Sequence, residues 1–243
     1  MGIEIIIKKD TIDNLQDKLE GKIPVTYEDL LVLISSHGLY NKLSIKIDNK
    51  TINIESQYPS ECYNLSKLDT SNITDMNHLF MNSMFNGDIS NWNMSNVTNM
   101  DGMFYKSKFN NNISKWDVSN VTSMNNMFYG ATKFNSDISK WDVSKVTDMD
   151  VMFDNAKSFN QNISSWNFDN IINCDYMFNN AKAFLDKYNS GEPLPKYTED
   201  IKTWVNINRY KMDAIDIKDR YGKEVDSFFS NFELDNKEVV KDI

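Results

Sequence analysis

A block of 24 or 25 residues recurs along the middle of this chain, and this repetition constrains the fold more than any other feature of the sequence. A chain that repeats itself at such a period stacks one structural unit on the next, so that neighbouring units bury one continuous core. Tryptophan and two series of phenylalanine mark the repeat. These residues are Trp92, Trp116, Trp141 and Trp166; Phe80, Phe104, Phe128, Phe153 and Phe178; and Phe85, Phe109, Phe134, Phe159 and Phe184.

The composition is uneven because one unit has been copied. No Glu, Arg or Pro lies between Glu61 and Glu192, yet this stretch holds eleven of the thirteen Met and four of the five Trp. Such a restricted amino-acid composition is typical of a repeated hydrophobic core and not of a cofactor pocket. We expect five copies and divide the chain into an N-terminal zone, a repeat zone and a C-terminal zone, at residues 1–64, 65–189 and 190–243.

Each copy predicts a strand followed by a short helix. Ile113, Trp116 and Val118 follow the spacing I-x-x-W-x-V, which matches the apolar skeleton of a leucine-rich repeat. The alternation puts Trp116 and Val118 on the buried face of a strand and leaves the residues beside them in solvent. Thr122 then caps a helix of one or two turns, whose apolar face begins at Met124.

The N-terminal zone predicts a mixed α/β piece. Its β-rich run 3–7 predicts a strand, and segments 43–47 and 51–54 alternate around a polar turn, which indicates a β-hairpin. Two helices are also expected, one at residues 11–19 and one from the capping box Thr26–Asp29 to Gly38.

The C-terminal zone begins with a turn or linker at Gly191–Pro195 and continues as a charged, helical sequence. Because the ends of a stack expose its core, both flanking zones are predicted to act as caps. The N-terminal zone is large for a cap, so a function of its own stays open. The C-terminal zone has two apolar clusters, namely Ile201, Trp204, Val205 and Ile207, and Tyr221, Val225, Phe228, Phe229 and Phe232.

The unit W-D-V-S-N-V-T-x-M-x-x-M-F-x-x-A-x-x-F-N-x-D-I-S-x-W resembles the BspA-like bacterial surface-protein repeat, a divergent leucine-rich repeat. It is most complete at Trp116–Trp141 and Trp141–Trp166. With the flanking zones, the resemblance predicts an α/β solenoid, a BspA-like leucine-rich-repeat array with a parallel strand per coil, flanked by an α/β N-terminal cap and an α-helical C-terminal cap. It further implies binding to proteins or host surfaces, often from secreted or lipid-anchored bacterial proteins.

The residues beside the buried strand positions form outward columns, which are the candidate partner-binding surface. Their lysines and aspartates would present a polar recognition face to a protein partner. The alternative is that these residues only maintain a soluble surface. Tyr105, Tyr129 and the rings of the C-terminal zone could supply aromatic anchors. The predicted partner-binding residues are Lys67, Asn91, Lys115, Lys140, Asp69, Asn93, Asp117, Asp142, Ser119 and Ser144.

The sequence offers little support for catalysis. It has no phosphate-binding glycine loop, dinucleotide fingerprint, H-E-x-x-H or C-x-x-C motif. Of the two histidines, His78 is expected to lie in solvent and His37 at a helix end. Of the two cysteines, Cys174 is expected to be a buried thiol, and we do not expect it to form a disulfide with Cys62. We therefore predict no enzyme activity, no catalytic residues, no metal and no cofactor.

The formal net charge is −9, which disfavours nucleic acid as a partner. No apolar run is long enough for a membrane span. We expect a monomer that binds a protein partner, whose identity the sequence does not give. The chain as it stands shows no export signal, which favours the cytoplasm; the cell surface would follow if a signal had been removed. The predicted function is a non-enzymatic protein-binding module, in one version an intracellular immunity or inhibitor protein; the alternative is a bacterial surface adhesion protein.

Overall fold

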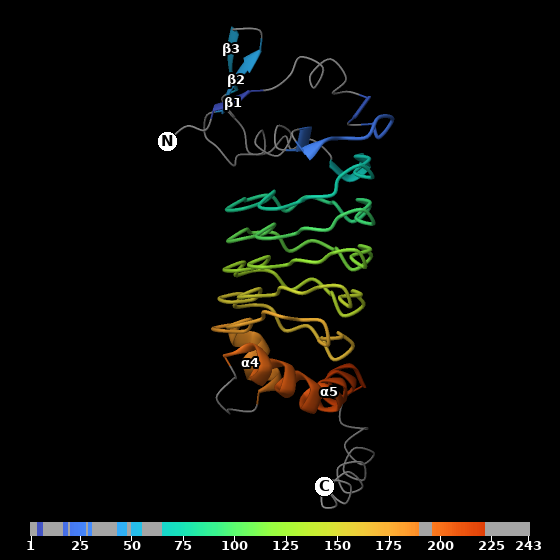
Figure 1. The fold of residues 1–243 in the computed structure, drawn as a ribbon, viewed down its shortest axis with the longest axis vertical. Coiled ribbons are helices and arrows are strands. Elements are labelled where there is room, and N and C mark those ends of the chain that lie inside the picture. Colours follow the sequence, from blue (N-terminus) through green and yellow to red (C-terminus); the bar gives the residue numbers. More distant parts are fainter. Residues whose placement is uncertain are drawn as a thin grey trace, which may run out of the picture.

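The computed structural model describes residues 4–6, 17–18, 20–27, 29–30, 43–47, 50–54, 65–189 and 196–221. Stacked coils form its central body, and the C-terminal helices lie across the last coil (Figure 1). The elements, in chain order, are β1 (Glu4–Ile6), β2 (Leu43–Ile47), β3 (Lys50–Ile54), the 3-10 helix η2 (Leu65–Lys67), α4 (Lys182–Tyr188) and α5 (Thr198–Tyr221).

The N-terminal strands form one small sheet in the order β1-β2-β3. Strand β1 pairs in parallel with β2, and β2 pairs antiparallel with β3, with Ile45 opposite Ile52. The predicted strand at 3–7 and the predicted hairpin are therefore confirmed. Most of the predicted helix at 11–19, Gly38, His37 and Cys62 lie outside the described residues.

The capping box at Thr26 is confirmed by two reciprocal hydrogen bonds. The Thr26 backbone N–H donates to Asp29 Oδ2 at 2.7 Å, and the Asp29 N–H donates to Thr26 Oγ1 at 3.2 Å. The buried Lys18 ammonium also contacts Asp29 at 2.8 Å. This segment joins the first coil, because Val25 N–H donates to the Asp69 carbonyl and the Tyr27 hydroxyl donates to the Asn77 carbonyl.

Backbone hydrogen bonds join each coil to the next. The N–H of Gly102 donates to Asn125 O, that of Asn126 to Asp150 O, and that of Val151 to Asp175 O, at distances of 2.8–2.9 Å. Single parallel bridges mark the same line of contact, because Asn99, Ser123 and Asp148 pair in sequence through the stack. Neighbouring coils are thereby held in register by one such bridge and by several backbone hydrogen bonds.

The predicted parallel strand per coil is wrong. Residues 65–189, all of which the structure describes, contain isolated bridges but no β-strand. The Trp116 N–H donates to Ile113 O and the Val121 N–H to Val118 O, so these groups close turns within their own coil. The Asp117 carboxylate also accepts the Ser119 N–H at 3.1 Å. Because Asp and Ser side chains compete for backbone groups in this way, a β-ladder does not form and no sheet-based solenoid is present in these residues.

The predicted short helix in each coil is also wrong. The segment after Thr122 is a run of turns, in which alternate N–H groups donate to the next coil instead of to the preceding helical turn. Positive φ angles interrupt the helical conformation at two positions in every coil. These are His78, Gly102, Asn126, Val151 and Tyr176, and Asn82, Lys106, Gly130, Asn155 and Asn180.

The structure also confirms the predicted core of the repeat zone. Trp116, Val118, Met124 and Phe128 are 4% exposed or less, as the alternation and the apolar spacing indicated. Phenylalanine rings of successive coils stack nearly parallel, with centroids 5.3–5.9 Å apart along the series from Phe80 to Phe178. Each coil thus contributes one layer to a continuous aromatic column.

A prediction follows from the backbone of Val151. Its φ of 48° is unfavourable for a β-branched residue, and Asn126 holds the equivalent position with φ 56°. We expect Val151→Asn to increase the free energy of unfolding by about 1 kcal/mol, because Asn tolerates this conformation better. Urea unfolding would measure the change. The reverse substitution Asn126→Val should destabilise by a similar amount, and a neutral or destabilising Val151→Asn would contradict the explanation.

Helix α5 covers the last coil with one apolar face. Its residues Ile201, Val205 and Met212 are at most 1% exposed, and Trp204 packs beside them. Ile207, which the sequence placed in the same cluster, is instead 73% exposed, so that part of the prediction is wrong. The structure describes no side chains for the second predicted cluster, at Tyr221–Phe232.

Candidate functional site

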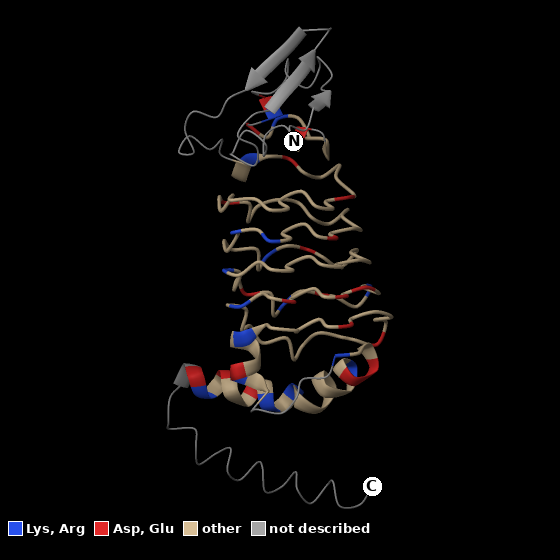
Figure 2. Ribbon diagram, turned by 90° about the vertical axis from the view of Figure 1, so that its left-hand side faces the viewer, with Lys and Arg blue, Asp and Glu red and all other residues tan. Residues whose placement is uncertain are grey.

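The predicted partner-binding residues recur at equivalent places on successive coils. Asn91, Asn93, Lys67, Lys115 and Lys140 are exposed. Of the remaining residues, Asp117 and Asp142 are exposed and Asp69, Ser119 and Ser144 are half-buried. We call these ten residues the column face. Along the length of the stack, both Lys and Asp segments recur on the coils, so neither end of the stack is only acidic or only basic (Figure 2).

The acidic column has a structural role. Asp117 Oδ1 accepts hydrogen bonds from the Ser119 hydroxyl at 2.6 Å and the Ser119 N–H at 3.1 Å. Asp142 accepts the Ser144 N–H at 3.0 Å. These serine hydrogen bonds lower the pKa of both carboxyl groups below the usual range. The carboxylates therefore stabilise the turns of their own coils, as Asn93 does where it replaces Asp.

The lysines of the column face differ from its aspartates in their contacts. Among the described residues, Lys67, Lys115 and Lys140 make no ion pair with an Asp or Glu. Lys145 lies nearby, and its ammonium donates to Asn120 Oδ1 at 2.6 Å, so it fills a place that Asn takes in the other coils. The three column lysines are consequently the charged groups of this face that remain free to contact a partner.

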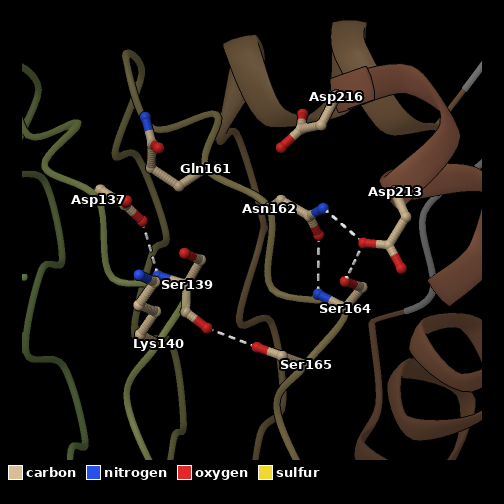
Figure 3. Close-up of a pocket in the computed structure, with 9 residues that line it drawn as sticks. All are labelled: Asp137, Ser139, Lys140, Gln161, Asn162, Ser164, Ser165, Asp213 and Asp216. Carbon is tan, nitrogen blue, oxygen red and sulfur yellow. Dashed lines mark hydrogen bonds between the residues drawn. The ribbon is translucent and has the colours of Figure 1, made fainter. Parts of the chain in front are cut away.

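A polar cavity of about 260 Å³ lies where the last coils meet α5 (Figure 3). It includes the predicted residue Lys140 and Ser165, which holds the place of Lys140 in the next coil. The other lining groups come from the preceding loops and from α5. The lining residues are Asp137, Ser139, Lys140, Gln161, Asn162, Ser164, Ser165, Asp213 and Asp216.

Two carboxylates of α5 lie at this cavity, one bonded to the last coil and one to α4. Asp213 Oδ1 accepts from Asn162 Nδ2 at 2.8 Å and from the Ser164 hydroxyl at 2.5 Å (Figure 3). Asp216 is occupied by the Lys187 ammonium at 2.7 Å and the Tyr188 hydroxyl at 2.8 Å. Burial and the Asp216 contact raise the pKa of Tyr188, so this hydroxyl stays protonated as a hydrogen-bond donor.

The cavity is lined by groups that are suited to hydrogen bonding. Its lining offers hydroxyl, amide, carboxylate and ammonium groups, without a cysteine or histidine. In the part of the chain that the structure describes, no group of three or more His, Cys, Asp or Glu could hold a metal ion. Cys174 is a buried thiol as expected, and burial raises its pKa to about 12. His78 is exposed, also as expected.

Sequence reasoning missed most of this cavity. Asn162 and Asp213 lie 51 residues apart, and no pattern in the repeat shows which face of α5 contacts the coil. One signal was available, because an Asp or Asn two residues before Ser recurs at Asp88, Asn112 and Asp137 and forms the same turn in each coil. This motif indicates a second polar column beside the lysines.

The described helices include none that is long and apolar enough to cross a membrane. A family model described as "Mycoplasma protein of unknown function, DUF285" matches residues 54–116 and 83–191. Together the matches span more than half of the chain and include the whole repeat zone. No curated protein and no solved structure matches. The resemblance to BspA-like surface repeats is confirmed at the level of this repeat family, without support for the narrower leucine-rich-repeat assignment.

Proposed function

Because the chain belongs to the family described as Mycoplasma protein of unknown function, DUF285, we propose that it is a protein-binding module without enzyme activity. The stacked coils act as a rigid support, and the column face contacts the partner. The observation that carries this proposal is the set of exposed lysines, Lys67, Lys115 and Lys140, which have no acidic partner in the described part of the chain.

The rigidity of the support favours this role. The turns that flank the lysines are fixed by Asp117 and Asp142, and the coils are joined by side chains as well as by backbone. Asn120 Nδ2 donates to Ser95 O at 2.7 Å, and Asn170 Nδ2 donates to Ser144 O at 2.6 Å. A surface that is ordered before binding loses less conformational entropy when a partner docks.

Two versions of this function differ in the partner. The net charge of −9 favours an inhibitor or immunity protein that neutralises a basic protein inside the cell. The match to a surface-repeat family favours adhesion at the cell surface instead. Affinity capture from the source cell, combined with fractionation of the protein, separates them. An intracellular basic partner supports the first version, and surface or host glycoproteins support the second.

The column face itself can be tested by charge reversal. We expect the double variant Lys115→Glu, Lys140→Glu to weaken partner capture about tenfold or more, because each lysine would contact an acidic group of the partner, even of a partner that is basic overall, and glutamate would repel that group. The thermal midpoint should stay nearly unchanged, because both side chains are exposed. Quantitative affinity capture would measure the loss. A matched change of two exposed lysines outside the face, Lys196→Glu, Lys211→Glu, should leave capture intact. Unchanged capture by the column-face variant would exclude the column face.

A further inference from the structure

Half of the lysines in residues 65–189 gather on one edge of the stack, in loops that contain no residue of the column face. This edge consists of the loops between the two phenylalanines of each coil, residues 105–108, 129–133, 154–158 and 179–183. We call it the basic edge. It holds five of the ten lysines of residues 65–189 but one of their thirteen aspartates. The lysines are Lys106, Lys108, Lys133, Lys157 and Lys182.

The basic edge is one continuous and ordered surface. Lys106 N–H donates to Tyr129 O at 2.7 Å, and Gly130 N–H donates to Asp154 O at 2.7 Å. Further along, the Ala183 N–H donates to Lys157 O at 3.2 Å. Basic segments lie one above another at one edge of the coils and continue to the start of α4 (Figure 2). The stacking of the coils therefore places these lysines in line, although they are distant in sequence.

The positive charge on this edge is largely uncompensated. Lys108, Lys133 and Lys157 have no ion pair among the described residues, whereas Lys182 contacts Asp186 at 2.6 Å. The one carboxylate, Asp154, is 8% exposed and accepts hydrogen bonds from the Asn155 and Asn179 amides. The basic edge therefore presents ammonium groups without ion pairs in the described part of the chain, although the net charge of the whole protein is −9.

An aromatic pair lies at the same edge. The Tyr105 and Tyr129 rings stack with centroids 4.8 Å apart. The Lys106 ammonium lies 5.0 Å from the Tyr105 centroid and 5.7 Å from the Tyr129 centroid. Tyrosine and a held cation provide the contact area and the polar groups that protein partners use as anchors.

We propose that the basic edge binds an acidic polypeptide segment of a partner protein, which lies along the stack and places carboxylates against successive lysines. This inference rests on the proposed protein-binding function and assigns it a second surface. A nucleic acid fits less well, because the two tyrosine rings cover each other and leave less open ring surface for a base to stack on. The acidic remainder of the chain would also repel a long phosphate backbone.

The test measures binding of a fluorescent oligoglutamate peptide to the full chain by anisotropy. Oligoglutamate should bind, and rising ionic strength should weaken it. The double variant Lys133→Glu, Lys157→Glu should bind about tenfold more weakly or worse. The control variant Lys196→Glu, Lys211→Glu changes two exposed lysines that belong to neither surface, and it should keep nearly the wild-type affinity. Circular dichroism should give the same thermal midpoint for all three proteins.

Three results would overturn the inference: no binding of oligoglutamate, an equal loss in both double variants, or a preference for oligothymidylate or for vesicles with phosphatidylserine over the peptide. Each of these results would count against the basic edge alone and not against the proposed function. If affinity capture recovers a partner whose binding survives Lys133→Glu, Lys157→Glu, the module binds protein but not through this edge. If the chain captures no protein that the column-face variant loses, the proposed function itself fails.

Discussion

Replacing Trp141 with alanine should lower the free energy of unfolding by about 3–5 kcal/mol, the largest effect expected of any single change considered for this protein. Trp141 is 3% exposed and lies in the middle of the stack. Its ring packs against Trp116 and Phe128, each with a centroid separation of 6.4 Å. Alanine would leave a cavity between coils that cannot close without disturbing the neighbouring rings.

The indole of Trp141 also makes a hydrogen bond between coils. Its Nε1–H donates to the Ile113 carbonyl of the preceding coil at 3.2 Å. Trp116 and Trp166 make the same bond, to Ile89 O and Ile138 O at 3.0 and 3.1 Å. The substitution therefore removes both packing and a partner for a carbonyl oxygen. Because stacked repeats depend on their nearest-neighbour contacts, a defect in a central coil weakens the stack on both sides.

A matched variant separates the two contributions. Trp141→Phe keeps much of the apolar volume but loses the Nε1–H donor, so we expect a smaller loss, on the order of 1–3 kcal/mol. Urea unfolding followed by circular dichroism would measure both variants. A loss below about 1 kcal/mol for Trp141→Ala would contradict the core position of the tryptophan series.

The sequence predicts this core well because periodicity records burial directly. The Trp, Met and Phe series recur every 24 or 25 residues, and their members in the stack are buried. Burial needs only the side-chain pattern, which is the same for many backbone paths. The same argument explains why Cys174, at a position that Met holds in other coils, is buried.

The backbone path was less predictable, because one side-chain pattern fits several hydrogen-bonding schemes. The alternation at Trp116 and Val118 suits a strand, but it also suits two successive turns that are closed by backbone hydrogen bonds, with the Asp117 carboxylate between them. The spacing after Thr122 suits a helix, but positive φ angles at Asn126 and Gly130 turn alternate N–H groups toward the next coil. Asn and Gly at these positions were the available signal, since both tolerate positive φ.

The candidate surfaces were predictable to different degrees. The column face follows from the repeat, so its exposed lysines could be named from the sequence alone. The cavity at Lys140 depends on which residues of α5 meet the coil, for example Asp213, and a contact between a repeat and a non-repeating helix leaves no periodic trace. The basic edge has a periodic signal, because four of its lysines recur at spacings of 25, 24 and 25 residues, namely Lys108, Lys133, Lys157 and Lys182. It was overlooked because the sequence alone does not show that the loops between the two phenylalanines form one edge of the stack.

Asn125→Asp is expected to have the second largest effect on stability. Asn125 lies between two carboxylates of adjacent coils. Its backbone N–H donates to Asp101 Oδ1 at 3.0 Å, and its side-chain Nδ2 donates to both carboxylate oxygens of Asp148, at 3.3 and 3.2 Å. Aspartate would lose the second donor and direct a negative charge at Asp148. We expect a loss of about 2 kcal/mol at neutral pH, since hydrogen bonds to charged groups contribute about this much.

Asp150 already shows the effect of such a charge, because it holds the place of Asn125 in the next coil. Its Oδ1 is buried without a hydrogen-bond partner in the described structure. Burial, and then the neighbouring Asp148 and Asp175, raise the pKa of Asp150 above its usual range. The folded state therefore favours the protonated form, and ionisation of Asp150 reduces stability as the pH rises through its raised pKa.

Asp150→Asn and Asn125→Asp should consequently change stability in opposite directions, and both changes should depend on pH. At neutral pH, Asp150→Asn should raise the thermal midpoint by roughly 2–4 °C, and Asn125→Asp should lower it by roughly 4–8 °C. Both differences should shrink as the pH falls below about 4, where an aspartyl group in the unfolded chain is also protonated. Thermal unfolding across this pH range provides the measurement. Equal effects at acidic and neutral pH would mean that the loss arises from packing and not from the charge on the 125 side chain.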